Sequence, residues 1–195
     1  MNLDLTGKSA LVCGSTAGIG KAIAKELAEM GASLVLMARN EEKLKTAVSE
    51  MDNSKGQQHS YVVADFSDVS TVKTAVESIQ NPIHILINNT GGPPGGPIID
   101  ADVRDFVSAF SMHLLCNHTL VQGVKQGMID SGYGRIINII STSVKIPLTG
   151  LGVSNTVRGA VGNWAKTMAN ELGVHGITVN NVLPGATATE RLTSI

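Results

Sequence analysis

Charge of either sign is scarce in this sequence, and cysteine is scarcer still. Lys and Arg number 15 and Asp and Glu 16, which gives a formal net charge of −1 at pH 7. This balance gives no general electrostatic reason to expect nucleic acid or an anionic membrane as a partner. The two cysteines are Cys13, expected at a buried strand end, and Cys116, expected within a helix. We therefore expect two reduced thiols rather than a disulfide.

Targeting and membrane segments are also absent from the sequence. Residues 1–8 show no basic segment followed by an apolar core, so a signal peptide is not expected. No uncharged apolar run approaches the length that spans a bilayer. These absences predict a soluble, cytoplasmic protein. Hydrophobic residues make up 43% of the chain and charged residues 16%, which predicts one folded domain over residues 1–195.

Apolar runs typical of strands alternate with helical patterns along nearly the whole chain. The expected strands are residues 9–12, 33–38, 61–64, 83–87, 135–140 and 177–183. The expected helices are residues 21–30, one segment capped by Asn40, one capped by Asp68 or Ser67, a long helix over 102–128 and a helix over 154–172. Strands this apolar suit a parallel sheet that is buried on both faces. We predict a Rossmann-type doubly wound α/β fold, a parallel sheet with helices on both faces in three α-β-α layers.

One Gly- and Pro-rich stretch, residues 91–97, has the composition of a linker. It follows a predicted strand directly, however, and ligands of doubly wound sheets bind at the carboxyl ends of the strands. We therefore interpret this stretch as a loop over a ligand site rather than as a domain boundary.

The residues after the first predicted strand form a glycine-rich turn. They are Gly14, Ser15, Thr16, Gly18, Ile19 and Gly20, and a predicted helix follows them. Gly permits the positive φ values and close backbone approach of a tight strand-to-helix turn. Backbone N–H groups at the start of a helix, aided by the helix dipole, bind phosphate. The turn predicts a dinucleotide site, although its spacing differs from the usual fingerprint by one inserted position.

Three further segments follow this turn along the chain. Together with the turn, and in this order, they resemble the short-chain dehydrogenase/reductase family, in particular its 3-oxoacyl-acyl-carrier-protein reductase-like members. They are Asn88-Asn89-Thr90-Gly91, Gly134-Arg135-Ile136-Ile137-Asn138-Ile139-Ile140-Ser141 and Val179-Asn180-Asn181-Val182-Leu183-Pro184-Gly185 with Thr189. The resemblance covers nearly the whole chain. It implies a nicotinamide cofactor and a carbonyl or alcohol as the small-molecule substrate.

The choice of cofactor depends on the end of the second predicted strand. An acidic residue there accepts hydrogen bonds from a ribose 2′-hydroxyl and repels a 2′-phosphate. This chain has Arg39 instead, whose planar guanidinium suits a phosphate. We therefore favour NADP(H) over NAD(H). The alternative is that Arg39 is a solvated loop residue without a role in binding.

The resemblance further implies that Asp65 and Phe66 flank the adenine. It places Asn89, Thr90 and Gly91 on the ribose side, and Pro184, Gly185, Thr187 and Thr189 near the nicotinamide and pyrophosphate.

The expected catalytic positions depart from the family pattern. Members of the family carry an Asn on the long helix, a Ser after the fifth strand and a Tyr-x-x-x-Lys motif. By the family's spacing, Ser141 keeps the Ser position, but Ser154 falls on the Tyr position, Arg158 on the Lys position and His113 on the Asn position. A serine hydroxyl is far less acidic than a phenol, so Ser154 is a poor proton donor. Arg158 stays protonated and retains the ability to bind ribose hydroxyls or phosphate.

Three residues are candidates to replace the missing phenol. His113 has a reference pKa near neutrality and is one candidate proton donor, the alternative being a helix histidine bonded to a backbone carbonyl or water. Lys145 is a candidate cation, or else a solvated loop lysine. Ser141 can donate a hydrogen bond that orients a substrate carbonyl, but no second group behind it would supply a proton. The other histidines lack the spacing of a zinc site, so no metal is expected.

Two functions therefore remain open, an NADP(H)-dependent oxidoreductase and an NADP(H)-binding module without dehydrogenase activity. The resemblance implies a homodimer or homotetramer. Family members also continue past the Pro-Gly motif through a substrate-covering segment and a final strand, which this sequence does not contain.

Overall fold

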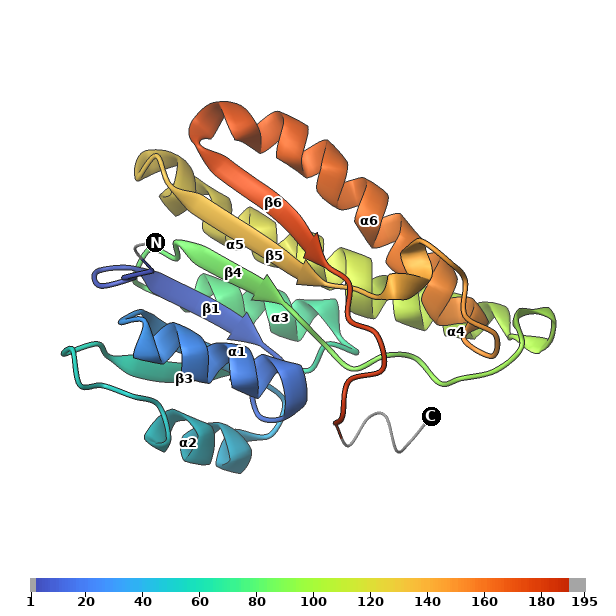
Figure 1. Ribbon diagram of the computed structural model, residues 1–195, viewed down its shortest axis with the longest axis horizontal. Coiled ribbons are helices and arrows are strands. Elements are labelled where there is room, and N and C mark those ends of the chain that lie inside the picture. The colour runs from blue at the N-terminus through green and yellow to red at the C-terminus, as the bar shows by residue number, and fades with distance from the viewer. Residues whose placement is uncertain (1–2, 190–195) are drawn as a thin grey trace.

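The computed structural model describes residues 3–189, and its six strands form one parallel sheet in the order β3-β2-β1-β4-β5-β6 (Figure 1). The strands are β1 Ser9–Cys13, β2 Ser33–Ala38, β3 His59–Val63, β4 Ile85–Asn88, β5 Gly134–Ile139 and β6 Ile177–Val182. The order reverses direction between β1 and β4, as in a doubly wound sheet. The predicted fold is confirmed, and the bounds of the strands shift by at most two residues.

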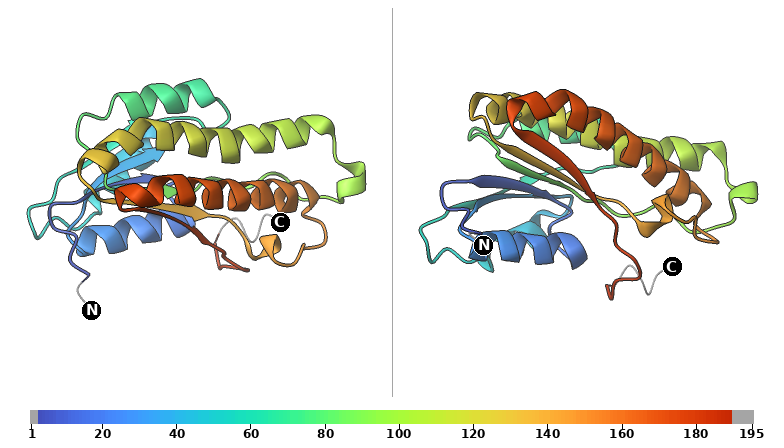
Figure 2. Two further views of the ribbon diagram at one scale, coloured as in Figure 1. Left: turned by 90° about the horizontal axis from the view of Figure 1, so that it is seen from above. Right: turned by 45° about the horizontal axis from the view of Figure 1, so that its top comes forward.

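Helices lie on both faces of this sheet (Figure 2). They are α1 Gly18–Glu29, α2 Glu41–Ser49, α3 Val69–Glu77, α4 Val103–Phe110, α5 Cys116–Asp130 and α6 Gly152–Leu172. Four short helical turns lie between the longer elements: η1 Ile98–Asp100 before α4, η2 Ser111–Leu115 between α4 and α5, η3 Thr142–Val144 before α6 and η4 Gly173–His175 after α6. The predicted caps are present, because the Asn40 side chain accepts from the Lys43 N–H and the Asp68 side chain from the Ser70 N–H. No helix within residues 3–189 is long and apolar enough to cross a membrane.

Two hydrophobic cores explain why the strands are apolar on both faces. Along β1, Leu11 and Cys13 point into the core under α3, α5 and α6, whereas Ala10 and Val12 point into the core under α1 and α2. All four are fully buried. Cys13 and Cys116 are both free thiols, as expected, and burial raises the pKa of each, that of Cys116 to about 11.

The long helix expected over residues 102–128 is interrupted. Asp102 caps α4, and the five residues of η2 then form a π-helical turn before α5 begins at Cys116. The Cys116 N–H bonds to the Ser111 carbonyl, which is the wider spacing of a π-turn. This turn rotates the side chains that follow it relative to those of α4, and His113 lies in its middle.

Three asparagines link the carboxyl ends of β4, β5 and β6. Asn88, Asn138 and Asn181 are in register across the sheet. The Asn88 Nδ2 donates to the Asn138 Oδ1 over 2.8 Å, and the Asn138 Nδ2 donates to the Asn181 Oδ1 over 3.0 Å. Asn138 is fully buried and Asn88 nearly so. Buried amides need partners, so each asparagine depends on its neighbour.

We expect the substitution Asn138→Ala to lower the free energy of unfolding by about 2 kcal/mol, because it leaves the buried Asn88 amide without its acceptor. Urea unfolding followed by circular dichroism measures the change. Asn170→Ala, at an exposed position of α6, is the control and should alter stability by less than about 0.5 kcal/mol. Equal losses in the two variants would contradict a structural role for the asparagine ladder.

Candidate functional site

The residues predicted for the site all follow the carboxyl ends of strands or lie on helices beside them. Since every strand is parallel, these ends meet at one edge of the sheet (Figure 1). The glycine turn follows β1, Arg39 follows β2, Asp65 and Phe66 follow β3, Asn89 to Gly91 follow β4, Ser141 follows β5, and Pro184 to Thr189 follow β6. His113 lies in η2, and Ser154 and Arg158 lie in α6. The fold thus brings these residues to one edge, while their individual roles remain predictions.

The glycine turn is packed too tightly for side chains. Gly14 and Gly18 have φ values of +58° and +51°. A Cβ on Gly20 would overlap the Gly14 carbonyl oxygen and lie 2.7 Å from the Asn89 Nδ2. That Nδ2 donates to the Cys13 carbonyl over 3.2 Å. The backbone of the turn therefore packs directly against the start of α1 and against Asn89, the residue after β4. Glycine is required because a Cβ would prevent the backbone segments from lying this close together.

The start of α1 offers backbone donors without a side-chain competitor. Ala17 is the N-cap, makes no side-chain cap, and the first turn has no acidic residue. Ser15 is buried, and its hydroxyl donates to the Met37 carbonyl over 3.4 Å. Beside the helix start lies a groove of about 430 Å³. Gly18, Ile19, Thr187 and Thr189 are among its lining residues, which places the segment after β6 next to the glycine turn.

Arg39 and Asp65 form the other end of this edge. Arg39 is exposed just beyond β2. Asp65 accepts from the Ser67 N–H over 2.9 Å, and this bond, with a smaller contribution from the charge of Arg39, holds the pKa of Asp65 below its usual value. Phe66 is buried in the core beneath α5, and its carbonyl accepts from the Cys116 thiol. Only the backbone of Phe66 is therefore available to a base at this edge.

Ser141 begins a short helical turn that is tied to the end of β6. Its Oγ accepts from the Ser143 N–H over 3.1 Å, which leaves its O–H free to donate. The Thr142 N–H bonds to the Pro184 carbonyl over 3.1 Å. The predicted substrate-orienting serine and the predicted nicotinamide-side residues are thus neighbours.

Helix α6 brings Ser154 and Arg158 to one face of the helix, as their four-residue spacing predicts. Ser154 is half-buried. The Arg158 Nη1 donates to the Ile139 carbonyl at the end of β5 over 2.7 Å. The guanidinium is therefore anchored two residues before Ser141, inside the site.

His113 is neutral in this environment. It is 3% exposed, and its Nε2 is buried with no hydrogen-bond partner within residues 3–189. Burial, followed by the charge of Arg158, lowers its pKa to about 3. An imidazolium proton donor at neutral pH is therefore not supported. Nor does its Nε2 bond to a backbone carbonyl of the residues that the structure describes.

The loop after β4 and the loop before α6 are hydrogen-bonded to each other, a contact that the sequence did not predict. The Gly96 N–H bonds to the Gly150 carbonyl over 2.6 Å, and the Gly152 N–H bonds to the Gly96 carbonyl over 3.3 Å. A Cβ on Gly152 would overlap Ile98. The stretch 91–97 is thus a loop bound to the start of α6, as the loop interpretation expects. Sequence reasoning missed this pairing and the asparagine ladder, whose only signal is polar residues within apolar strands.

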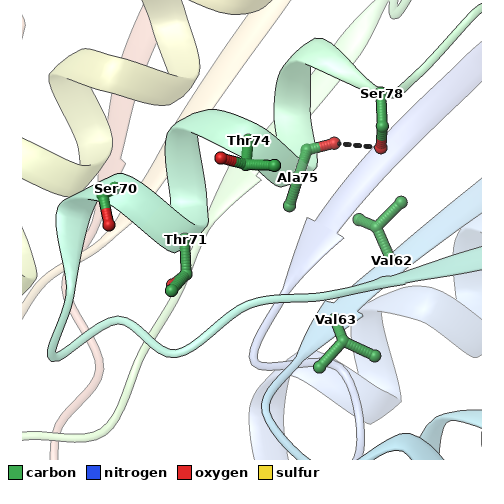
Figure 3. A pocket seen from close by; sticks show the side chains of 7 residues that line it. All are labelled: Val62, Val63, Ser70, Thr71, Thr74, Ala75 and Ser78. Carbon is green, nitrogen blue, oxygen red and sulfur yellow. Dashed lines mark hydrogen bonds between the residues drawn. The ribbon is translucent and has the colours of Figure 1, made fainter.

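A second groove lies between β3 and α3 (Figure 3), and one of its lining residues, Thr71, is hydrogen-bonded to the backbone of Asp65. It has a volume of about 390 Å³ and is lined by Val62, Val63, Ser70, Thr71, Thr74, Ala75 and Ser78. Its hydroxyls bond locally, as Ser78 does to the Ala75 carbonyl over 2.7 Å. Among the described residues, no three His, Cys, Asp or Glu are grouped so that they could hold a metal ion. The glycine-turn edge therefore remains the candidate site.

Comparisons with known proteins find similar chains over nearly the whole sequence. The family model for short chain dehydrogenases matches residues 8–195. The gluconate 5-dehydrogenase of Gluconobacter oxydans is 36% identical over 190 residues, covering 96% of this chain and 74% of that protein.

Solved structures are similar over nearly the whole chain. The L-sorbose reductase from Gluconobacter frateurii, complexed with NADPH and L-sorbose, superimposes with a TM-score of 0.92 at 30% identity, over 97% of this chain and 73% of its own. A gluconate 5-dehydrogenase from Burkholderia cenocepacia, in complex with NADP and tartrate, has a TM-score of 0.88 at 31% identity, over 97% and 75% of the two chains.

The pKa of His113 predicts an acid-sensitive stability. Between the unfolded pKa of 6.5 and the folded pKa of about 3, the unfolded chain binds a proton at this residue and the folded chain does not. Stability therefore falls as pH is lowered through this window, by about 2 kcal/mol from pH 7 to pH 5. We expect His113→Gln to remove this part of the pH dependence in chemical unfolding measured at both pH values.

The matched control for this experiment is His175→Gln, because His175 is exposed in η4. The control should keep the pH dependence of the unsubstituted protein. A His113→Gln variant with an unchanged pH dependence would show that His113 titrates normally in the folded state.

Proposed function

Because this chain belongs to the short-chain dehydrogenase family, we propose that it is an NADP(H)-dependent oxidoreductase that interconverts a carbonyl and an alcohol. The observation that carries the proposal is the glycine turn, where Gly14, Gly20 and Asn89 pack without room for a Cβ beside an uncapped helix start. Such a turn presents backbone N–H groups to a phosphate. Relatives named as dehydrogenases and reductases support the same reading.

The residues at the edge fit a dinucleotide phosphate. We propose that the start of α1, with Thr16, Gly18 and Ile19, holds the pyrophosphate, and that Arg39 binds a 2′-phosphate. Asp65 and the Phe66 backbone are proposed for the adenine, and Asn89, Thr90 and Gly91 for the adjoining ribose. Pro184, Gly185, Thr187 and Thr189 are proposed for the nicotinamide end. Similar structures that contain NADP or NADPH support NADP(H) over NAD(H).

When bound, the nicotinamide supplies or accepts the hydride, while the proton is exchanged with water. In the chain itself, we propose that Ser141 donates a hydrogen bond to the substrate oxygen. Arg158, anchored on the Ile139 carbonyl, supplies a fixed positive charge and donors for ribose hydroxyls. Ser154 is a smaller and less acidic side chain than the tyrosine of the family pattern, and His113 is a neutral group near the charge of Arg158.

A second function is favoured by one specific observation, the lack of a group in this site that titrates near neutrality. His113 is neutral, Ser154 is a weak acid, and an arginine does not release its proton. An NADP(H)-binding module without dehydrogenase activity uses the same glycine turn and needs no proton donor. The two candidates differ in turnover, not in cofactor binding.

Assembly and location are further proposals. Exposed apolar residues on and near α4 support a homodimer or homotetramer, since monomers rarely expose apolar patches of this kind. They include Ile99, which is 90% exposed, Val103 and Val107. A cytoplasmic location remains a prediction from sequence.

Arg39 should determine the preference for NADPH. We expect Arg39→Gln to weaken NADPH binding about tenfold, since a charge-assisted contact to phosphate is lost, and to leave NADH binding within about twofold. Fluorescence titration of both nucleotides measures this. Lys43→Gln, which removes an exposed cation from the neighbouring helix, is the control. A loss shared equally by NADPH and NADH would place the 2′-phosphate elsewhere.

Turnover separates the two candidate functions. We expect NADPH oxidation with a panel of carbonyl substrates, with Ser141→Ala lowering kcat/KM about a hundredfold because a hydrogen bond to the reacting oxygen is lost. Ser154→Ala should change kcat/KM less than about threefold, because a serine donates a proton poorly. Tight NADPH binding with no turnover across the panel would instead establish the binding module. The reverse ranking of the two serines would refute the roles proposed for them.

A further inference from the structure

Basic and aromatic side chains gather at the amino ends of β1, β4 and β5, on the edge of the sheet opposite the glycine turn (Figure 1). Lys8 precedes β1, His84 precedes β4, and Tyr133 and Arg135 lie at the start of β5. Backbone bonds of 2.9 Å join them, from the His84 N–H to the Ser9 carbonyl and from the Arg135 N–H to the His84 carbonyl. We call Lys8, His84, Tyr133 and Arg135 the amino-end cluster. The five residues of β1, about 16 Å of strand, separate it from the glycine turn.

Two cations of the cluster lie against one aromatic ring. The Lys8 Nζ is 4.3 Å from the centroid of the Tyr133 ring, and the Arg135 Cζ is 4.2 Å from it. The ring attracts each cation but neutralises neither. The two charges can be no farther apart than these distances together, which is less than the Debye length of about 10 Å at 0.1 M salt. They therefore repel each other, and an anion between them would relieve this repulsion.

Backbone contacts hold the cluster in place. The Arg135 Nη1 donates to the carbonyls of Gly134 and Gly176, over 2.7 and 3.2 Å. The Nδ1 of His84 accepts from the Ser9 N–H over 3.1 Å, so the neutral imidazole carries its hydrogen on Nε2. The guanidinium and the imidazole are thus anchored before any ligand arrives.

The cluster also offers two neutral donors. Burial, followed by the charge of Lys8, lowers the pKa of His84, so the ring is neutral at pH 7. Its centroid lies 6.3 Å from that of Tyr133. Neither the His84 Nε2 nor the Tyr133 hydroxyl bonds to another described residue, and neither is among the fully buried atoms. Both are therefore open to a ligand from solvent.

No carboxylate of the described residues neutralises the two cations. The carboxylates on the segments that lead into these and the neighbouring strands are Asp4, Glu29, Glu77, Asp130 and Glu171. Within residues 3–189, none of them forms an ion pair with Lys8 or Arg135. Asp4 and Glu77 pair with other lysines instead. The charge that acts on the pKa of His84 is that of Lys8, not that of a carboxylate.

We propose that the amino-end cluster is a binding site for a phosphate dianion, either the free ion or the phosphomonoester of a small molecule. The ammonium of Lys8 and the guanidinium of Arg135 supply charge, and charge-assisted hydrogen bonds to phosphate are strong. The His84 Nε2–H and the Tyr133 hydroxyl supply donors in other directions, as a tetrahedral anion requires. This site lies at the opposite edge from the proposed cofactor site and does not depend on the oxidoreductase function.

The ring NMR signals of His84 test the proposal in the full chain, because phosphate bound at the glycine turn would not report there. The signals are identified by their loss in His84→Gln. With ionic strength held constant by chloride, we expect inorganic phosphate to move them saturably. Lys8→Met should weaken the apparent affinity at least about tenfold, because one of two charges is lost, and Lys8→Arg should retain most of it.

Two controls leave the cluster intact. Lys166→Met removes the same charge from an exposed position of α6, and Arg39→Gln removes a cation from the opposite edge. Each should leave the phosphate affinity at His84 within about twofold. Glycerol 3-phosphate distinguishes the two sources of the ligand. Movement of the signals by both compounds supports a phosphomonoester site, and movement by inorganic phosphate alone supports a site for the free ion.

The proposal is overturned if the His84 signals do not move at phosphate concentrations up to about 50 mM, or if they move with equal affinity in Lys8→Met. Neither result would affect the proposed cofactor site, which is tested by nucleotide binding. Should Lys8→Met fail to fold, as judged by circular dichroism, Arg135→Gln carries the same expectation.

Discussion

The close approach of three backbone segments at Gly14, Gly20 and Asn89 is the constraint on which the rest of the site depends. A single Cβ at Gly20 would push α1 away from β1 and from the residue after β4. The Asn89 amide, which donates to the Cys13 carbonyl, fixes this arrangement from the β4 side. These contacts therefore fix the position of the start of α1 relative to the carboxyl ends of β1 and β4. Everything that follows along the edge, from Arg39 to Thr189, is positioned relative to this contact.

Electrostatically, the two ends of the edge have different characters. At the β2 and β3 end, the pKa of Asp65 is lowered mainly by its hydrogen bond from the Ser67 N–H, and the charge of Arg39 makes a smaller contribution. At the β5 and β6 end, Arg158 is held on a carbonyl and His113 is kept neutral by burial. The β5 and β6 end thus carries the positive charge of Arg158, and its buried His113 does not exchange a proton near neutral pH.

Much of the fold could be predicted from sequence because local patterns decide it. The alternation of apolar runs with capped helices fixed the parallel sheet, and the caps Asn40 and Asp68 lie where their side chains predict. The π-turn at Ser111–Leu115 was not predictable, since a wider hydrogen-bond spacing leaves no mark in hydrophobic periodicity. The protonation of His113 was also inaccessible. It depends on burial and on Arg158, which is 45 positions away in the chain and comes close only in the fold.

The backbone bonds between Gly96 and the Gly150–Gly152 segment tie together two loops that come from opposite halves of the chain. The loop after β4 cannot swing outward alone, because both the N–H and the carbonyl of Gly96 are bonded to the residues that begin α6. Any displacement of this loop away from α6 therefore requires that both of these backbone bonds break.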